Sequence, residues 1–173
     1  MKKIMALLIA IALVAAMAVS CTEEKKNPEV DTVSATDTQL TESTLDDIIT
    51  EASEIVDGTS GVSLKRAALA SKVAGFVALQ GFTDSDLENL KKDFEEKVGA
   101  LQGEAKSNLD VSFIEVFKIL DKAIDEGKYD EVKADFEDAG VAEEMVTVLK
   151  TPDLAKSYSI FKSAYLTLGN SED

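Results

Sequence analysis

The chain opens with an apolar run, continues through a polar stretch, and then carries apolar residues at helical spacing almost to its end. Lys2 and Lys3 precede the run, which extends over residues 4–19 without a charged residue, a proline or a glycine. Such a run is at or below the roughly 17 to 25 residues that a membrane-spanning helix needs. It is therefore typical of the apolar core of a signal peptide rather than of a stable transmembrane anchor.

A polar stretch follows at residues 22–44. It holds one proline, no aromatic residue and only scattered aliphatic residues, so it offers too little apolar surface to offset the entropy lost on ordering. We expect a flexible tether here, and a coil of this length spans roughly 25 to 30 Å root mean square. The pattern thus divides the chain into a signal peptide at residues 1–20, a tether at residues 21–44 and a folded domain at residues 45–173.

The folded domain shows helical spacing of its apolar residues from its first turn. The first helix is expected to begin near Leu45 and to end at Gly58. Ser43 and Asp46 form its candidate capping box. Its expected buried face repeats at i, i+3, i+4 and i+7 and consists of Leu45, Ile48, Ile49, Ala52, Ile55 and Val56. The second helix, expected at residues 63–80, is apolar or small on most sides, which is typical of a helix surrounded by others.

Two longer helices are expected next. Thr83 is the expected N-cap of the third helix, because Asp84 and Asp86 favour the positive helix start. The apolar stripe of that helix consists of Leu87, Leu90, Phe94, Val98 and Leu101. After a stretch interrupted by glycine, a fourth helix that ends at Gly127 is marked by Phe113, Val116, Phe117, Leu120, Ala123 and Ile124.

Three further helices complete the expected set. Two are short, at residues 129–139 and 142–149. Thr151 and Pro152 are expected to open the last helix, since proline suits the first helical position. Its expected core face is Leu154, Tyr158, Phe161, Tyr165 and Leu168.

The fold class predicted from these patterns is all-α, with a single bundle of about six to seven helices after a disordered tether. No segment shows sustained two-residue alternation bounded by hairpin turns. One internal similarity stands out, since residues 91–100 and 133–142 agree at five of ten positions. A duplicated helical hairpin and a chance similarity between acidic amphipathic helices both explain it.

The junction between the apolar run and the tether holds the only cysteine of the chain, Cys21, directly after the small residues Ala18, Val19 and Ser20. This junction resembles the lipobox of bacterial lipoproteins. Ala18, in place of the usual leucine, is similar to the relaxed form found in some small spirochaetal outer-membrane lipoproteins. The resemblance implies that the signal peptide is cut before Cys21 and that this cysteine carries a covalent diacylglycerol and an N-acyl chain such as palmitate.

An alternative is an ordinary secretory peptide cut near Ser20, which leaves Cys21 unmodified. An unpaired reactive thiol in an oxidising compartment disfavours that alternative. Two or three acyl chains would hold the protein stably at a membrane, whereas one holds it only marginally. By the same resemblance, the absence of an acidic residue directly after the cysteine, where Thr22 stands, implies the outer membrane rather than the inner membrane of the bacterial envelope. Exposure to the periplasm and exposure at the cell surface both remain open.

Charge narrows the range of partners. The chain has 18 basic and 33 acidic residues and a formal net charge of −15, and removal of Lys2 and Lys3 with the signal peptide makes the mature chain more negative. Nucleic acid is excluded as a partner, because its binding requires Lys and Arg to neutralise phosphates. Anionic lipid headgroups also repel this chain, so we expect the domain to stand off the membrane on its lipid anchor. Basic proteins, cationic peptides and metal cations are compatible with the charge.

The residue types present exclude most catalytic classes. The chain contains no histidine, which removes Ser-His-Asp triads and the commonest zinc sites. Its one cysteine is assigned to lipid attachment, and no glycine-rich phosphate loop or twelve-residue calcium loop occurs. We therefore expect a non-enzymatic protein with no cofactor other than the acyl chains on Cys21 and with no metal site. An enzyme that uses only carboxylates and lysines is the remaining catalytic alternative.

Three sets of polar residues are candidates for function. An acidic face for a basic protein or peptide is formed by Asp125, Glu126, Asp130, Glu131, Asp135, Glu137, Asp138, Glu143 and Glu144; the alternative is an ordinary solvated surface. Ser159 and Lys162 match the Ser-x-x-Lys motif of serine acyl enzymes without its companion motifs, so we interpret the match as a coincidence. Lys65, Arg66 and Lys72 form either a patch for an anionic ligand or, as we expect, cations paired with acidic neighbours.

Two functional hypotheses follow. The first is a lipid-anchored envelope protein with a structural or protein-interaction role. The second is a carrier that holds a hydrophobic ligand between helices, in space left by the small residues Ala67, Ala68, Ala70, Ala74, Gly75 and Ala78. Close packing of neighbouring helices explains the same small residues. The oligomeric state is not indicated by the sequence.

Overall fold

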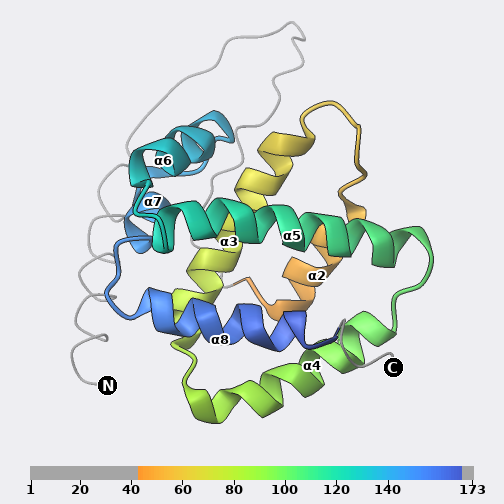
Figure 1. Ribbon diagram of the computed structural model, residues 1–173. Helices are drawn as coiled ribbons and strands as arrows, with labels where there is room; N and C mark the ends of the chain where they lie inside the picture. The colour runs from red at the N-terminus through yellow and green to blue at the C-terminus, as the bar shows by residue number, and fades with distance from the viewer. Residues whose placement is uncertain (1–42, 169–173) are drawn as a thin grey trace, which may run out of the picture. The chain divides into compact units, whose positions relative to one another are not determined.

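The computed structural model of the chain describes residues 43–168, apart from the side chain of Glu144. Every regular element in this range is a helix, and no strand occurs in it (Figure 1). The prediction of an all-α fold is confirmed. The predicted signal peptide, Cys21 and the predicted tether lie outside the described residues, as do the last five residues of the predicted domain.

The described part contains seven α-helices, labelled as in Figure 1, and one short 3₁₀ helix. Their bounds are α2 at Leu45–Glu54, α3 at Val62–Gln80, the 3₁₀ helix η1 at Asp84–Asp86, α4 at Leu87–Gly99, α5 at Glu104–Ile124, α6 at Tyr129–Asp138, α7 at Glu143–Val148 and α8 at Leu154–Leu166. Each helix expected from the sequence has a counterpart among them. The largest difference is α5, which begins nine residues before its first expected core residue, Phe113.

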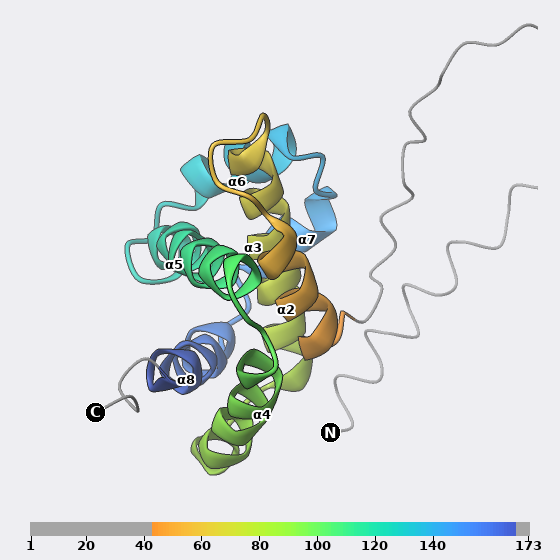
Figure 2. The ribbon, with the colours of Figure 1, turned by 90° about the vertical axis from the view of Figure 1, so that its right-hand side faces the viewer.

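Helix α3 is the central helix, as its sequence predicts. Ten of its 19 residues are buried, and it contacts α2, α5, α6, α7 and α8. Helices α5 and α8 lie side by side and cross α3 on one side, with α4 beyond α8 (Figures 1 and 2). A helix buried on most sides needs apolar or small residues around its whole circumference, which explains the composition of this segment.

An aromatic cluster joins α4, α5 and α8. Its members are Phe94, Phe113, Phe117, Phe161 and Tyr165, which are all buried. The rings of Phe113 and Tyr165 stack with centroids 4.4 Å apart, and the rings of Phe94 and Phe161 meet edge to face at 5.2 Å. Aromatic pairs in these arrangements add to the stability that burial alone provides. The cluster therefore fixes the relative positions of these three helices.

The predicted cap of the first helix is displaced by one residue. Thr44, not Ser43, is the N-cap of α2, and its hydroxyl accepts a hydrogen bond from the Asp47 backbone N–H at 3.2 Å. The Asp47 carboxylate accepts from the Thr44 N–H at 2.9 Å, which completes the capping box. Hydrogen bonds from Thr44 hold the pKa of Asp47 below its usual value. Asp46, the partner expected for Ser43, instead pairs with Lys97 of α4 at 2.5 Å.

The end of α2 also differs from the prediction. The helix ends at Glu54, because Ile55 adopts an extended conformation and turns its side chain into the core, where it is 3% exposed. Val56, expected on the buried face, is 51% exposed, since the helical periodicity no longer applies to it. Gly58 lies in the turn that follows, with a positive φ of 74°, a conformation that glycine adopts without strain.

The last helix begins after its expected proline. Helix α8 starts at Leu154 with Asp153 before it, so Pro152 does not occupy the first helical position. The Leu154 N–H donates to the Thr151 carbonyl at 3.0 Å, which places Pro152 at the second position of a β-turn, where its fixed φ also fits. Four of the five expected core residues of this helix are buried, and Leu168 is partly buried.

Candidate functional site

The candidate site is a hollow of about 490 Å³ between α4, α5 and α8. Ligand pockets of proteins commonly have volumes of 300–1,000 Å³. Its wall is built by Glu95, Val98 and Gly99 of α4, Lys106, Asp110 and Ile114 of α5, and Tyr165, Leu166 and Leu168 at the end of α8. We call it the α4–α5–α8 hollow.

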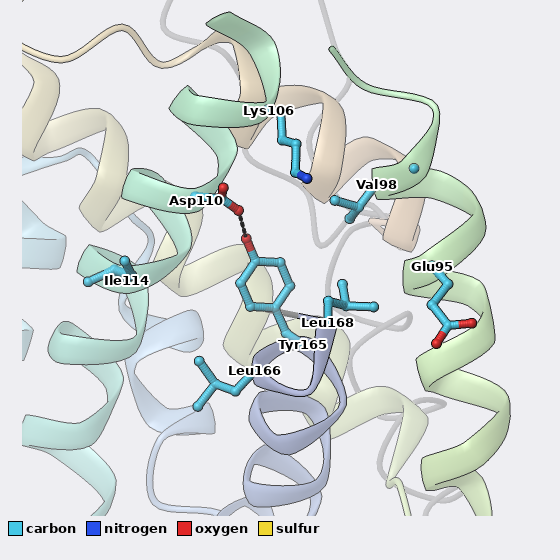
Figure 3. Close-up of a pocket in the computed structure, with 9 residues that line it drawn as sticks. Glu95, Val98, Lys106, Asp110, Ile114, Tyr165, Leu166 and Leu168 are labelled. Atoms are coloured by element: carbon cyan, nitrogen blue, oxygen red, sulfur yellow. Dashed lines mark hydrogen bonds between the residues drawn. The ribbon is translucent and has the colours of Figure 1, made fainter. Parts of the chain in front are cut away.

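Helix α5 supplies one whole side of this hollow. Lys106, Asp110 and Ile114 are four residues apart, so they lie along one face of the helix over about 12 Å, given a rise of 1.5 Å per residue. Figure 3 shows this row on α5, with Tyr165 and Leu166 of α8 opposite and Val98 of α4 beside them. The hollow is therefore elongated along α5.

Tyr165 and Asp110 form the polar floor of the hollow. The Tyr165 hydroxyl donates a hydrogen bond to Asp110 Oδ1 at 2.7 Å (Figure 3). Burial, together with this hydrogen bond to the carboxylate, raises the pKa of Tyr165 well above its usual value, so the phenol stays neutral. The phenol hydroxyl of the floor therefore already has its hydrogen-bond acceptor.

The entrance of the hollow is apolar. Ile114 is 48% exposed and Leu166 is 47% exposed. They are two of only five large hydrophobic side chains that are exposed among the described residues, the others being Val56, Leu64 and Leu79. A scattered exposed apolar residue is ordinary, whereas two beside one hollow indicate a surface for an apolar ligand or partner.

A second hollow of about 350 Å³ lies between α3, α5 and α6. Arg66, Glu115, Asp135 and Asp138 contribute to its wall, together with Val62, Ser63, Leu64, Ala67 and Ile119. Arg66 is buried, and its Nε and Nη2 atoms have no hydrogen-bond partner among the described residues. Its Nη2 lies 3.3 Å from Asp57 Oδ1 in an ion pair.

The fold brings only some residues of the predicted acidic face close together. Asp125, Glu126, Asp130, Glu131, Asp135, Glu137, Asp138 and Glu143 are all exposed, while the side chain of Glu144 is outside the described part. Lys128 pairs with Glu126 at 2.6 Å, which raises the pKa of that lysine. Lys133 pairs with Glu137 at 3.4 Å and with Glu143 at 3.7 Å. The eight described carboxylates thus spread from the end of α5 over α6 to the start of α7, and only Asp135 and Asp138 reach the second hollow.

Two of the three lysine and arginine candidates on α3 are paired with carboxylates, as the sequence analysis expects. Arg66 pairs with Asp57, and Lys72 pairs with Glu51 of α2. Lys65 is exposed. These pairs leave no cluster of unpaired cations on the described part of α3.

The Ser-x-x-Lys match does not form a nucleophile and base pair. Lys162 Nζ lies 2.7 Å from both carboxylate oxygens of Asp121, and Tyr158 donates to the same carboxylate at 2.8 Å. Ser159 is exposed, and Phe161 between them is fully buried in the core. Lys162 therefore connects α8 to α5.

The small residues of α3 pack closely against neighbouring helices. Ala70 and Ala74 are buried. A Cβ built on Gly75 would lie 2.7 Å from the Met145 Cε of α7, so that side chain fills the space beside this glycine. Of the six small residues singled out from the sequence, only Ala67 lines either hollow. The α4–α5–α8 hollow is lined by none of these six residues.

Sequence reasoning missed the residues of the α4–α5–α8 hollow as a group. Ile114 and Leu166 gave the available signal, because each is a large apolar residue outside the expected core stripe of its helix. Within residues 43–168, no three His, Cys, Asp or Glu side chains are grouped so that they could hold a metal ion. None of the helices described in this range is both long enough and apolar enough to cross a membrane.

Comparison with known proteins finds no family model, curated protein or solved structure that matches this chain.

Proposed function

We propose that this chain is a non-enzymatic lipoprotein of the bacterial envelope, attached to the outer membrane by acyl chains on Cys21. The observation that carries the proposal is the apolar run of residues 4–19, which ends at the only cysteine of the chain after Ala18, Val19 and Ser20. Diacylglycerol and an N-acyl chain on that cysteine supply the membrane affinity. The polypeptide after it, with its net negative charge, is repelled by anionic headgroups and extends away from them.

In this proposal the helical domain is an interaction module, and its partner is a basic protein or peptide. Support comes from the excess of acidic over basic residues and from the exposed carboxylates between the end of α5 and the start of α7. Asp130, Glu131 and Asp138 form no ion pair with any described residue. Clusters of one charge accelerate the association of an oppositely charged partner and select against like-charged ones.

The test is the binding of a lysine-rich peptide to the full chain at several salt concentrations. We expect Asp130→Asn, Glu131→Gln and Asp138→Asn together to weaken binding by about tenfold at low salt, equivalent to about 1.4 kcal/mol. A control with Asp93→Asn, Glu96→Gln and Glu104→Gln has the same net charge and removes exposed carboxylates from α4 and the start of α5. Equal losses in both variants would mean that the peptide responds only to net charge, and the acidic face would then be an ordinary solvated surface.

A second candidate function is a carrier for a hydrophobic ligand. The observation that favours it is the α4–α5–α8 hollow, with its apolar entrance at Ile114 and Leu166. Concave sites lined mostly by apolar side chains with a few polar groups are typical of ligand-binding sites. This function is compatible with the lipid anchor and uses a different surface from the acidic face.

A further inference from the structure

Three further features of the described domain are candidates for a ligand site. They are the α4–α5–α8 hollow, the second hollow at Arg66, and the carboxylate of Asp121 with its two partners on α8. Asp121 is saturated by Lys162 and Tyr158. Arg66 already has Asp57 beside its Nη2, and the carboxylates of Glu115, Asp135 and Asp138 around that second hollow repel an anion. The α4–α5–α8 hollow is large enough for a ligand, is elongated along α5, and has an apolar entrance at Ile114 and Leu166.

We propose that the α4–α5–α8 hollow binds a single acyl chain, which enters between Ile114 and Leu166 and lies along α5 over the ring of Tyr165. This inference rests on the second candidate function above and assigns its site and its ligand class. It does not depend on the acidic face.

The shape of the hollow favours a chain over a compact ligand. Its α5 side extends from Lys106 past Asp110 to Ile114, a distance of about 12 Å at 1.5 Å per residue, and its volume is about 490 Å³. Val98 of α4 and Tyr165 of α8, both less than a tenth exposed, contribute to its wall beside the row on α5. A methylene chain matches an elongated space whose wall includes Val98, Ile114 and Leu166, because each of its segments leaves water for apolar contacts there.

The polar groups of the hollow agree with a ligand whose bound part is apolar. Asp110 accepts the hydrogen bond of Tyr165, so the floor does not require a polar ligand atom to satisfy the phenol. Lys106 and Glu95 are exposed, and Figure 3 shows both on the wall away from Ile114 and Leu166. The polar head of an amphiphile would therefore stay near water while its chain occupies the hollow.

An acyl chain has two sources in a lipid-anchored protein. One is a free fatty acid or a lipid taken from the membrane, and the other is an acyl chain on Cys21 of the same protein. Both present the same methylene chain to Ile114, Tyr165 and Leu166. The experiment therefore includes a variant that cannot be acylated.

Photo-crosslinking in cells tests the site with the full chain. Bacteria that produce the protein are given a palmitate analogue with a photoactivatable diazirine and an alkyne, irradiated, and the cross-linked peptides are identified by mass spectrometry. We expect cross-links on the segments of α4, α5 and α8 that line the hollow. Ile114→Gln combined with Leu166→Gln should lower their yield by about tenfold, equivalent to about 1.4 kcal/mol.

Val56→Gln combined with Leu79→Gln is the matched control. These side chains are 51% and 52% exposed, so the control removes the same amount of exposed apolar surface away from the hollow and should leave the yield unchanged. All four substituted positions are about half exposed, so both variants should fold, which circular dichroism checks. Cross-links spread over the whole domain, or equal losses in both variants, would overturn the inference.

The Cys21→Ser variant identifies the source of the chain. Cross-links that persist in it assign the hollow to a free or membrane lipid, and cross-links that disappear assign it to the acyl chains on Cys21. Intact mass of the same samples reports acylation separately. An acylated protein without cross-links in the hollow would refute the acyl-chain site alone, and a non-acylated protein with them would refute the lipoprotein proposal alone.

Discussion

Two tyrosines of α8 donate hydrogen bonds to carboxylates of α5. Tyr158 donates to Asp121 at 2.8 Å, and Tyr165 donates to Asp110 at 2.7 Å. The tyrosines are two helical turns apart, and both are buried. Burial raises the pKa of each phenol, and the hydrogen bond to the carboxylate raises it further. The two bonds therefore keep α5 and α8 in register along the α4–α5–α8 hollow only while the phenols are protonated.

These pKa shifts predict a loss of stability at high pH. A phenol in the unfolded chain ionises near pH 10, while Tyr158 and Tyr165 in the folded chain stay protonated beyond it. Above about pH 10 the folded state therefore binds more protons than the unfolded state, so the free energy of unfolding decreases as pH rises. Each tyrosine contributes a slope of up to about 1.4 kcal/mol per pH unit.

Urea unfolding of the two Tyr→Phe variants between pH 9 and 11 measures this slope. Each variant should show a shallower decrease than the native chain, whatever its stability at neutral pH. An identical slope in the native chain and in both variants would show that neither phenol is protected from ionisation by the fold.

Ser157 is predicted to contribute more to the stability of the fold than the exposed Ser159. Its hydroxyl accepts from the Phe82 N–H at 2.7 Å and donates to the Val77 carbonyl at 2.8 Å. That carbonyl also accepts from the Gly81 N–H, so Ser157→Ala leaves mainly the Phe82 N–H unsatisfied. We expect a loss of about 1–3 kcal/mol in chemical denaturation, whereas Ser159→Ala, at an exposed position, should change stability by less than about 0.5 kcal/mol.

At the scale of single elements, the sequence pattern predicted the buried faces of α2, α4, α5 and α8 but not where each helix ends. Ile48, Ile49 and Ala52 are buried as expected, because one apolar face every 3.6 residues is a property of the whole helix. The end of a helix depends instead on a few local hydrogen bonds. Val56 and Pro152 were misplaced for that reason, since a change of one or two residues moves a side chain off the helical face.

The capping box of α2 gives a test of this boundary. Thr44→Ala removes the hydroxyl that accepts from the Asp47 N–H and should lower the free energy of unfolding by about 1 kcal/mol. Ser43→Ala should have little effect, although the sequence pattern favours Ser43 as the cap. Thermal unfolding of the two variants decides between the positions, and a larger loss for Ser43→Ala would contradict the observed cap.

The contact between α3 and α7 predicts a difference between small and large substitutions at Gly75. A Cβ there would approach the terminal methyl of Met145 to 2.7 Å, and this flexible end of the side chain can move. Because alanine favours a helix by about 1 kcal/mol over glycine, Gly75→Ala should change stability by less than about 1 kcal/mol. Gly75→Leu should destabilise by about 1–3 kcal/mol through overpacking, and equal tolerance of both in urea denaturation would argue against this close contact.

At the scale of the whole molecule, the site was less predictable than the fold. Glu95, Lys106 and Tyr165 are far apart in sequence and meet only because α4, α5 and α8 pack together. The helical periodicity of one segment does not indicate which residues of other helices will lie beside it. The small residues of α3 were the sequence signal for internal space, and at Gly75 the side chain of Met145 fills that space. Ile114 was detectable as an apolar residue off its helical stripe, but its role depends on the helices opposite.

The anchor and the domain have separate tasks in this account. In the proposed function, acyl chains on Cys21 would hold the protein at the membrane, and the acidic domain would bind a partner or ligand in the surrounding aqueous space. The claim on which the proposed location and membrane attachment both depend is the modification of Cys21.

Intact mass and detergent phase partitioning of the native protein beside its Cys21→Ser variant test that claim most directly. The account predicts that the native protein loses residues 1–20, gains the mass of a diacylglycerol and an N-acyl chain, and enters the detergent phase, while the variant does none of these. If the native protein instead keeps an unmodified thiol and remains in the aqueous phase together with the variant, the lipid anchor and the membrane location are wrong.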